Sequence, residues 1–397
     1  MPVAKKIAEA ARCSSWIRQM FEEGACLAQT HGRDNVYDFS IGNPNLEPPR
    51  EFQRVMEELV HDPTPGLHGY MSNAGYREAR DAVAAYLAKD QGVPVTGDNV
   101  VMTCGAGGSL NVIFKAILDP GDEVIVPRPY FMEYGSYVDN HGGSLKLVST
   151  TPDFLLDIEA MEAAIDGKTR AVLINSPNNP TGRVYPAESL EALAGLLERK
   201  SRDNGRMIYL VSDEPYRRIV YDGIHVAPAM AGYTGTIIAS SYSKELSVAG
   251  ERIGYVAANP AIPQVDALME GLIMANRILG FVNAPALMQR AVARLQGVAV
   301  DVTPYKRNRD VLCQGLAEAG FQLVKPEGAF YLFPRSPLED DVAFCREMLE
   351  HLVLVVPGSG FGLAGHFRLA YCVAPKVVDG ALPAFRAVGA KYFGTHA

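Results

Sequence analysis

A lysine that directly follows a buried strand is the residue whose position most clearly suggests chemistry. Lys244 ends the run Ser-Ser-Tyr-Ser-Lys at 240–244, and Arg252 follows eight positions later. The apolar residues 236–239 predict a buried strand, so the amine lies at the sheet edge where open α/β sheets hold ligands. Such a lysine can form a Schiff base with an aldehyde if its surroundings disfavour the ammonium form. Ser241 and Arg252 offer the hydroxyl and the positive fork that a phosphate needs.

A second segment ends an apolar strand in a carboxylate. Residues 207–212 predict a buried strand, Asp213 follows it, and Tyr216 comes three residues later. A carboxylate at that place is costly unless it is paired with a cation. A protonated pyridine nitrogen would be such a partner. The alternative is an ordinary strand-end aspartate that caps the next helix.

Two further strands end in turns that could bind polar groups. Residues 171–175 predict a strand that runs into Ser-Pro-Asn-Asn-Pro-Thr-Gly, where Asn179 could donate to a phenolate oxygen, as could Tyr216. The strand at 100–103 runs into Gly-Ala-Gly-Gly at 105–108, which includes Ala106 and Gly107 and predicts an anion site at a helix start. A dinucleotide-binding loop is the alternative for this stretch, but Leu110 stands where that motif needs a third glycine.

Together these segments resemble the pyridoxal-phosphate-dependent aminotransferases of class I/II, which belong to the aspartate aminotransferase superfamily of fold type I. The resemblance covers almost the whole chain. It begins with Ser-Trp-Ile-Arg at 15–18 and Ser-Ile-Gly-Asn-Pro at 40–44, and ends with segments at 326–331, 357–362 and 367–371. It implies an α/β fold, with a large domain whose mostly parallel central sheet is flanked by helices and a smaller α+β domain built from both chain ends.

The resemblance also implies a role for each matching residue. The groups expected at the cofactor's ring are Lys244, Asp213, Asn179, Tyr216 and Phe131, although Tyr130 could take the stacking place. The groups expected at its phosphate are Ala106, Gly107, Ser241, Arg252 and Tyr70, the last reaching the site of the other subunit. The substrate's α-carboxylate is expected at Gly42, Asn179 and Arg368. Catalysis is expected to depend on Lys244, Asp213 and Tyr216.

These parts predict a transaminase of the EC 2.6.1 type that uses pyridoxal 5'-phosphate. Arg368 can grip a carboxylate with two parallel hydrogen bonds and so fix the substrate's Cα–H bond. Lys244, once it is a free neutral amine, can take the Cα proton and return it one carbon along. An amino group would then pass from an L-amino acid to a 2-oxo acid in a ping-pong cycle, within amino acid metabolism and its biosynthetic branches.

Length and composition agree with a two-domain globular enzyme. The chain has 397 residues, 48% hydrophobic and 21% charged, which predicts two domains rather than one core. The expected boundaries are 1–48 for the N-terminal part of the small domain, 49–287 for the large cofactor domain and 288–397 for the rest of the small domain. Within them, we expect one or two amphipathic helices to about residue 30 and a long helix over 285–310.

Charge and cysteine usage limit the partners. A net charge of −8 argues against general binding to nucleic acid or to membranes, and no apolar run has the length of a membrane span. The six cysteines form no Cys-x-x-Cys pair and no metal-ligand spacing with the eight histidines, which predicts no metal site and a cytoplasmic location. A homodimer with shared active sites is expected, because Tyr70 would have to serve the neighbouring site.

The substrate and the reaction outcome stay open at this point. Arg277, 33 residues after Lys244, is a candidate for binding the distal carboxylate of aspartate, glutamate or 2-oxoglutarate, or else a plain interface arginine. A carbon–sulfur β-lyase with the same cofactor is the alternative enzyme. A non-catalytic regulatory protein that binds the cofactor is a third reading, but such proteins carry a DNA-binding module for which 397 residues leave no room.

Overall fold

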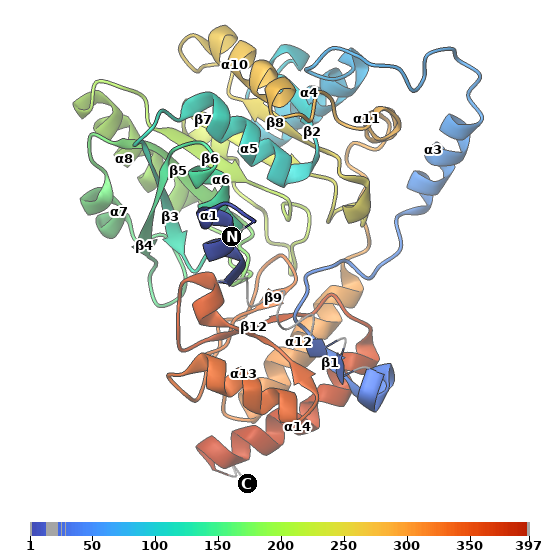
Figure 1. Cartoon of the computed structure of the whole chain (residues 1–397), viewed down its shortest axis with the longest axis vertical. Helices are drawn as coiled ribbons and strands as arrows, with labels where there is room; N and C mark the ends of the chain where they lie inside the picture. Colours follow the sequence, from blue (N-terminus) through green and yellow to red (C-terminus); the bar gives the residue numbers. More distant parts are fainter. Residues whose placement is uncertain (1, 13–22, 25, 28, 395–397) are drawn as a thin grey trace.

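The structure is a computed structural model that describes residues 2–12, 23–24, 26–27 and 29–394 (Figure 1). Helix α1 (Lys5–Arg12) lies in the segment for which an amphipathic helix is expected. The Ser-Trp-Ile-Arg motif at 15–18 and the middle of that expected segment lie outside the described residues.

A seven-stranded sheet with the order β2-β8-β7-β6-β5-β3-β4 forms the larger part of the molecule (Figure 1). Its strands are β2 (Val100–Thr103), β3 (Glu123–Arg128), β4 (Ser144–Ser149), β5 (Thr169–Asn175), β6 (Tyr209–Asp213), β7 (Thr236–Ser241) and β8 (Gly254–Ala258). Strands β7, β6, β5, β3 and β4 pair in parallel, whereas β8 runs opposite to the other six strands and pairs antiparallel with both of its neighbours, β2 and β7. The predicted mostly parallel sheet is therefore confirmed. Since neighbouring parallel strands end at the same edge, Asn175 and Asp213 lie opposite each other in register.

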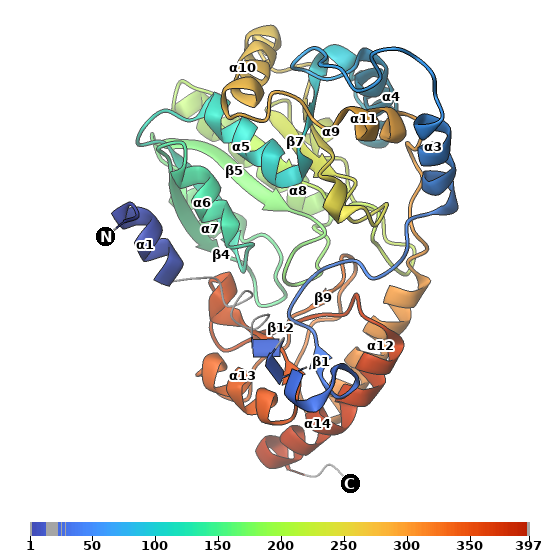
Figure 2. The ribbon, with the colours of Figure 1, turned by 45° about the vertical axis from the view of Figure 1, so that its right-hand side comes forward.

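Helices cover both faces of this sheet (Figure 2). Alternation along the strands decides which side chain meets which layer: Val124 and Val126 pack with α5 and α10, whereas Ile125 packs with α7 and α8. No helix in the described part of the chain has the length and apolar character that a membrane crossing requires. The helices are α1, α3 (Arg50–Val60), α4 (Arg77–Gln91), α5 (Gly105–Ile117), α6 (Glu133–Asp139), α7 (Ile158–Ala164), α8 (Ala187–Asp203), α9 (Ala229–Gly232), α10 (Val265–Ile278), α11 (Ala286–Ala293), α12 (Thr303–Glu318), α13 (Asp341–Glu350) and α14 (Pro375–Phe393).

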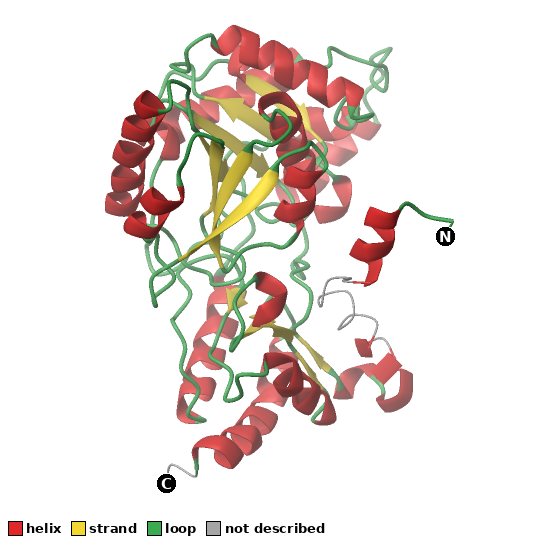
Figure 3. Ribbon diagram, turned by 60° about the vertical axis from the view of Figure 1, so that its left-hand side comes forward, coloured by secondary structure: helices red, strands yellow, loops and turns green. Residues whose placement is uncertain are grey.

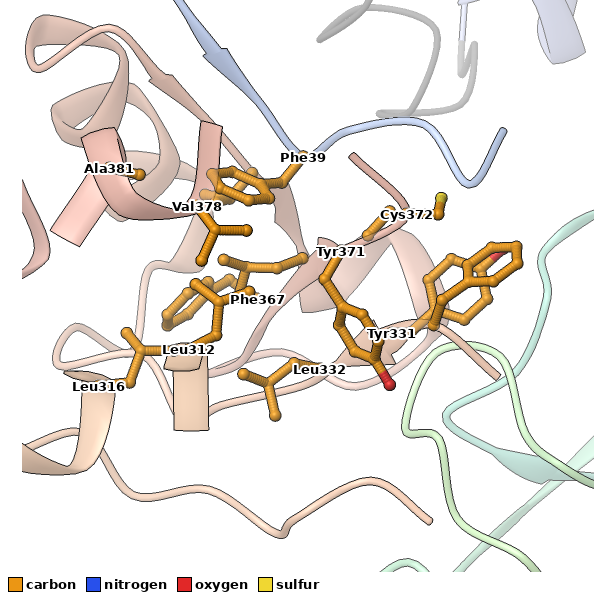
Figure 4. Close-up of a cluster of buried hydrophobic side chains, with 14 of the residues drawn as sticks. Phe39, Leu312, Leu316, Tyr331, Leu332, Phe367, Tyr371, Cys372, Val378 and Ala381 are labelled. Atoms are coloured by element: carbon orange, nitrogen blue, oxygen red, sulfur yellow. The ribbon is translucent and has the colours of Figure 1, made fainter. Parts of the chain in front are cut away.

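A smaller unit lies below the large sheet and has its own strands (Figure 3). Strands β11 (Val356–Pro357), β12 (Phe367–Ala370) and β9 (Tyr331–Leu332) form an antiparallel sheet, and β1 (Tyr37–Asp38) pairs with β10 (Val353–Leu354). Both ends of the chain contribute to its core, in which Phe39 packs with Leu312, Phe367 and Val378 (Figure 4). This core supports β9 and β12, which carry Tyr331 and Arg368 to the facing edge of the large sheet.

The expected long helix over residues 285–310 is wrong. The chain forms α11 (Ala286–Ala293), leaves the helical path, and begins α12 at Thr303. Gly297 has φ +82°, a left-handed conformation that interrupts a helix. Pro304 then lies in the first turn of α12, where its missing N–H costs nothing, so it starts a new helix rather than continuing the old one.

Candidate active site

A cavity of about 330 Å³ lies between the carboxyl edge of β5, β6 and β7 and the strands β9 and β12. It is lined by eleven of the twelve predicted site residues together with residues that were not predicted. The predicted ones are Gly42, Ala106, Gly107, Phe131, Asn179, Asp213, Tyr216, Ser241, Lys244, Arg252 and Arg368. The carboxyl ends of parallel strands therefore bring together side chains that are far apart in sequence.

Lys244 lies a short distance past the end of β7 and points into this cavity. Its Nζ donates to the carbonyl oxygen of Gly42 at 2.9 Å and lies 5.6 Å from the centre of the Phe330 ring. Burial lowers the pKa of Lys244 from 10.5 to about 8. At pH 7 about a tenth of the amine is then neutral, far more than for an ordinary lysine, and the neutral form is the one that can act as a nucleophile or a base.

Asp213 ends β6 and is buried with one oxygen paired and the other without a partner. The hydroxyl of Tyr134 donates to Oδ2 at 2.5 Å, and the Asn175 amide donates to the backbone oxygen of Asp213 at 2.9 Å. Oδ1 has no hydrogen-bond partner among the described residues. Burial raises the pKa of Asp213 from 3.8 to about 7. The carboxylate thus needs a cation or a donor from a ligand at Oδ1.

Arg368 on β12 lies across the cavity and is fully buried without a carboxylate partner among the described residues. Its Nη1 donates to Oδ1 of Asn179 at 3.2 Å and its Nη2 donates to the carbonyl oxygen of Ser40 at 2.5 Å. Its Nε has no partner there, and burial lowers its pKa. The rings of Tyr331 and Phe361 lie 4.8 and 4.6 Å from its guanidinium carbon. A buried guanidinium held in this way is suited to a carboxylate.

Aromatic residues complete the walls of the cavity. The hydroxyls of Tyr216 and Tyr331 lie 2.8 Å apart, and burial raises the pKa of Tyr216, so it stays a neutral donor. Phe131 lines the cavity, whereas Tyr130 packs outside it, where its ring covers Gly362 and its N–H donates to the oxygen of Phe361 at 3.0 Å. Of the two aromatics considered for stacking, only Phe131 lies at the site.

The start of α5 and Arg252 form the polar end of the cavity. Ala106 and Gly107 belong to the first turn of α5, whose free N–H groups suit an anion. Arg252 adopts the left-handed conformation with φ 53°, and its guanidinium donates to the backbone oxygens of Ala249 and Cys104 at 3.0 and 3.5 Å. Gly105 leaves room for it, because a Cβ there would lie 2.9 Å from Nη2 of Arg252. Ser241 closes this end.

Two of the predicted residues lie outside the cavity of their own chain. Tyr70 is 92% exposed in the loop between α3 and α4, and Arg277 is exposed near the end of α10. Conversely, the prediction missed residues that line the cavity, and no spacing in the sequence singles them out. These are Glu133, Tyr134, Tyr137, Asn175 and Tyr331.

Comparisons with known proteins agree on one family. The profile described as "Aminotransferase class I and II" matches residues 34–385. The chain belongs to the class I and II aminotransferases. It is 35% identical to the aspartate/prephenate aminotransferase of Thermus thermophilus over 88% of this chain and 90% of that protein. A solved aminotransferase from Eubacterium rectale is similar with a TM-score of 0.96 and 42% identity, covering 99% of both chains. An aspartate aminotransferase from Thermus thermophilus with maleate has a TM-score of 0.87 and 30% identity, covering 98% of this chain and 100% of that one.

Aminotransferases of this family use pyridoxal 5'-phosphate to move an amino group between an amino acid and a 2-oxo acid. The cavity fits that cofactor, because it presents an unpartnered carboxylate oxygen, an amine of lowered pKa and an anion site at a helix start. The chain is thus a transaminase, and a carbon–sulfur lyase is not favoured. Among the described residues no group of three or more His, Cys, Asp and Glu side chains could hold a metal ion.

Proposed function

We propose that this aminotransferase transfers the amino group of an L-amino acid to a 2-oxo acid in a ping-pong cycle, with Lys244 moving the proton. The observation that carries the proposal is an amine of lowered pKa in the same cavity as a buried guanidinium: Lys244 has a pKa of about 8, and Arg368 has no carboxylate partner and an unbonded Nε among the described residues. Arg368 and Asn179 hold the α-carboxylate, while Lys244 takes the Cα proton and returns it one carbon along.

The cofactor residues follow from the chemistry of each wall. Asp213 would pair with the pyridine nitrogen, Lys244 would hold the aldehyde carbon, and Asn179 and Tyr216 would donate to the phenolic oxygen. Phe131 would cover the ring face, and the phosphate would be held by Ala106, Gly107, Ser241 and Arg252. The bound cofactor supplies the electron-withdrawing ring that makes the Cα proton acidic. This part of the proposal is supported by the unpartnered Oδ1 of Asp213 and by the start of α5 at the opposite end of the cavity.

We further propose a cytoplasmic homodimer that serves amino acid biosynthesis. Tyr70, exposed in its own protomer, would then reach the phosphate in the site of the neighbour. The domain boundaries proposed above, 1–48, 49–287 and 288–397, are supported by the shared core of Phe39 with residues of α12 and α14. A test of the dimer is its mass in solution, followed by complementation in mixed dimers that carry Tyr70→Ala in one protomer and Lys244→Ala in the other.

Several relatives bear the names aspartate or aspartate/prephenate aminotransferase, so aspartate and glutamate with 2-oxoglutarate are the first substrates to try. Arg277 stays a prediction for the distal carboxylate, and because it is exposed in its own chain it could act only in the site of a partner. Substitution of Arg277 by alanine that leaves the preference for dicarboxylates over neutral amino acids unchanged would remove this role.

The decisive experiment adds a panel of amino acids to the purified holoenzyme and follows the absorbance of the cofactor. Conversion of the aldehyde form to the amine form, with release of the matching 2-oxo acid, is the expected result. Lys244→Ala should abolish the conversion and the adduct that borohydride fixes on residue 244. Release of pyruvate and ammonia from cysteine conjugates without a 2-oxo acid would instead point to the lyase reaction.

A further inference from the structure

One acidic side chain lines the candidate active site without a part in the chemistry described above. Glu133 is the first residue of α6, is half-buried, and lines the cavity together with Gly42, Tyr331 and Arg368. Its Oε2 is shielded from solvent and has no hydrogen-bond partner among the described residues. Burial raises its pKa, and the positive charge of Arg368, which lines the same cavity, opposes that rise.

The cavity therefore contains three buried polar atoms without partners among the described residues: Oδ1 of Asp213, Nε of Arg368 and Oε2 of Glu133. Buried polar groups in folded proteins are nearly always paired with protein or water, so each of these cavity-lining atoms is available to a group of a bound ligand. The pyridine nitrogen accounts for Asp213 and the α-carboxylate accounts for Arg368. The atom on Glu133 is left for another part of the substrate.

We propose that Glu133 selects the substrate by the far end of its side chain, favouring a hydrogen-bond donor or a cation there and disfavouring a second carboxylate. This inference rests on the proposed transamination and narrows its substrate class. An ionised carboxylate accepts hydrogen bonds but cannot donate one. An ammonium, guanidinium, amide or hydroxyl group therefore satisfies it, whereas another carboxylate repels it.

Glu133 and Arg368 line the same small cavity. A cavity of about 330 Å³ must hold both the cofactor ring and the substrate. A substrate whose α-carboxylate binds Arg368 therefore lies in a space that Glu133 also lines, where its far end can meet Oε2. Among the described residues of the chain, Arg252 and Arg368 are the arginines that line the cavity, and they are assigned to the phosphate and to the α-carboxylate, so a distal carboxylate finds no further arginine of the same protomer there.

The test uses three five-carbon acids without an α-amino group that differ at the far end: glutarate with a carboxylate, pentanoate with a methyl group and 5-aminopentanoate with an ammonium group, the last checked by cofactor absorbance for imine formation. Their Kd values are measured by calorimetry on the holoenzyme, on Glu133→Gln and on Glu159→Gln. Glu159 is a matched control, because it is an exposed glutamate in the first turn of the short helix α7. Thermal unfolding and the cofactor absorbance check that each variant folds and binds the cofactor.

In the unaltered protein, 5-aminopentanoate should bind most tightly and glutarate least. Glu133→Gln should tighten glutarate about tenfold and weaken 5-aminopentanoate about tenfold, with little change for pentanoate. Glu159→Gln should reproduce the unaltered protein. Equal shifts for all three acids, no shift, or tightest binding of glutarate to the unaltered protein would overturn the role of Glu133. The amino acid panel is a separate readout: an absence of any conversion there would refute transamination while leaving the binding preference measurable.

Discussion

The carboxylate of Asp213 gives the sharpest test of the site, because its ionisation should destabilise the protein when the cofactor is absent. Burial raises its pKa from 3.8 to about 7, and that difference corresponds to about 4 kcal/mol of unfolding free energy when the group is fully ionised. Because the folded pKa is the higher one, the folded state favours the neutral acid. The destabilisation is absent below about pH 3.8 and grows until the pH passes about 7.

The perturbation is Asp213→Asn in the apoprotein, which keeps the shape of the side chain and removes its titration. Between about pH 5.5 and about pH 8.5 the unaltered apoprotein should lose roughly 2 kcal/mol relative to the variant. Urea unfolding at several pH values, at one fixed protein concentration, measures this difference. Other buried groups such as Lys244 and Glu245 titrate in both proteins and cancel in the comparison.

Adding the cofactor should reverse the ranking. A cationic ring nitrogen next to Oδ1 stabilises the ionised aspartate, so the unaltered holoenzyme should gain more stability from the cofactor than the variant does. The variant should also convert amino acids more slowly by about two orders of magnitude or more. Parallel pH curves for the two apoproteins, or an unchanged conversion rate in the variant, would refute the reasoning.

Three further predictions concern the other walls of the cavity. The rate of amino acid conversion should rise with pH around pH 8, the pKa of Lys244, because the neutral amine is the reactive form. A stopped-flow rate that does not change with pH around this value would contradict the prediction. Arg368→Lys should lower kcat/KM about 100-fold, mainly through KM, because an ammonium cannot make the two parallel hydrogen bonds of the guanidinium. Steady-state kinetics with the best amino donor measure both constants, and an unchanged KM would count against carboxylate binding at Arg368. Gly42→Ala should destabilise the protein by about 1–3 kcal/mol, because the new Cβ would lie 2.1 Å from the hydroxyl of Tyr331; urea unfolding tests it, and unaltered stability would mean that the two groups are not in contact.

The sequence predicted the large sheet well because its strands carry a strong local signal. Each of β5, β6 and β7 is a short apolar run that ends in a polar residue or a turn, and these ends meet at one edge of the sheet. Asn179, Asp213 and Lys244 could therefore be predicted to lie near one edge of the sheet, and the resemblance to a known family supplied their expected roles. The helix over 285–310 failed because Gly297 and Pro304 interrupt a segment whose other residues favour helix.

The residues that the sequence missed reach the cavity through tertiary packing. Tyr134 and Glu133 are neighbours on α6, and a seven-residue helix gives no pattern that tells which of its side chains faces a ligand. Only the packing of α6 against the end of β6 places the Tyr134 hydroxyl at Asp213. The choice between Phe131 and Tyr130 was likewise decided by a contact distant in sequence, that of Tyr130 with Gly362.

The pairing of polar groups links stability to function in this protein. Leaving a buried donor or acceptor unpaired costs about 1–3 kcal/mol, and more for a charge, so a fold selected for stability alone would not keep three such atoms in one cavity. Asp213, Arg368 and Glu133 keep them. Two of the three atoms face groups that the cofactor or every substrate must supply, so Oε2 of Glu133 is the one of the three that can distinguish one amino acid from another. If Glu133 acts as proposed, then α6, a helix that carries neither the anchoring lysine nor the carboxylate-binding arginine, contributes to the choice of substrate.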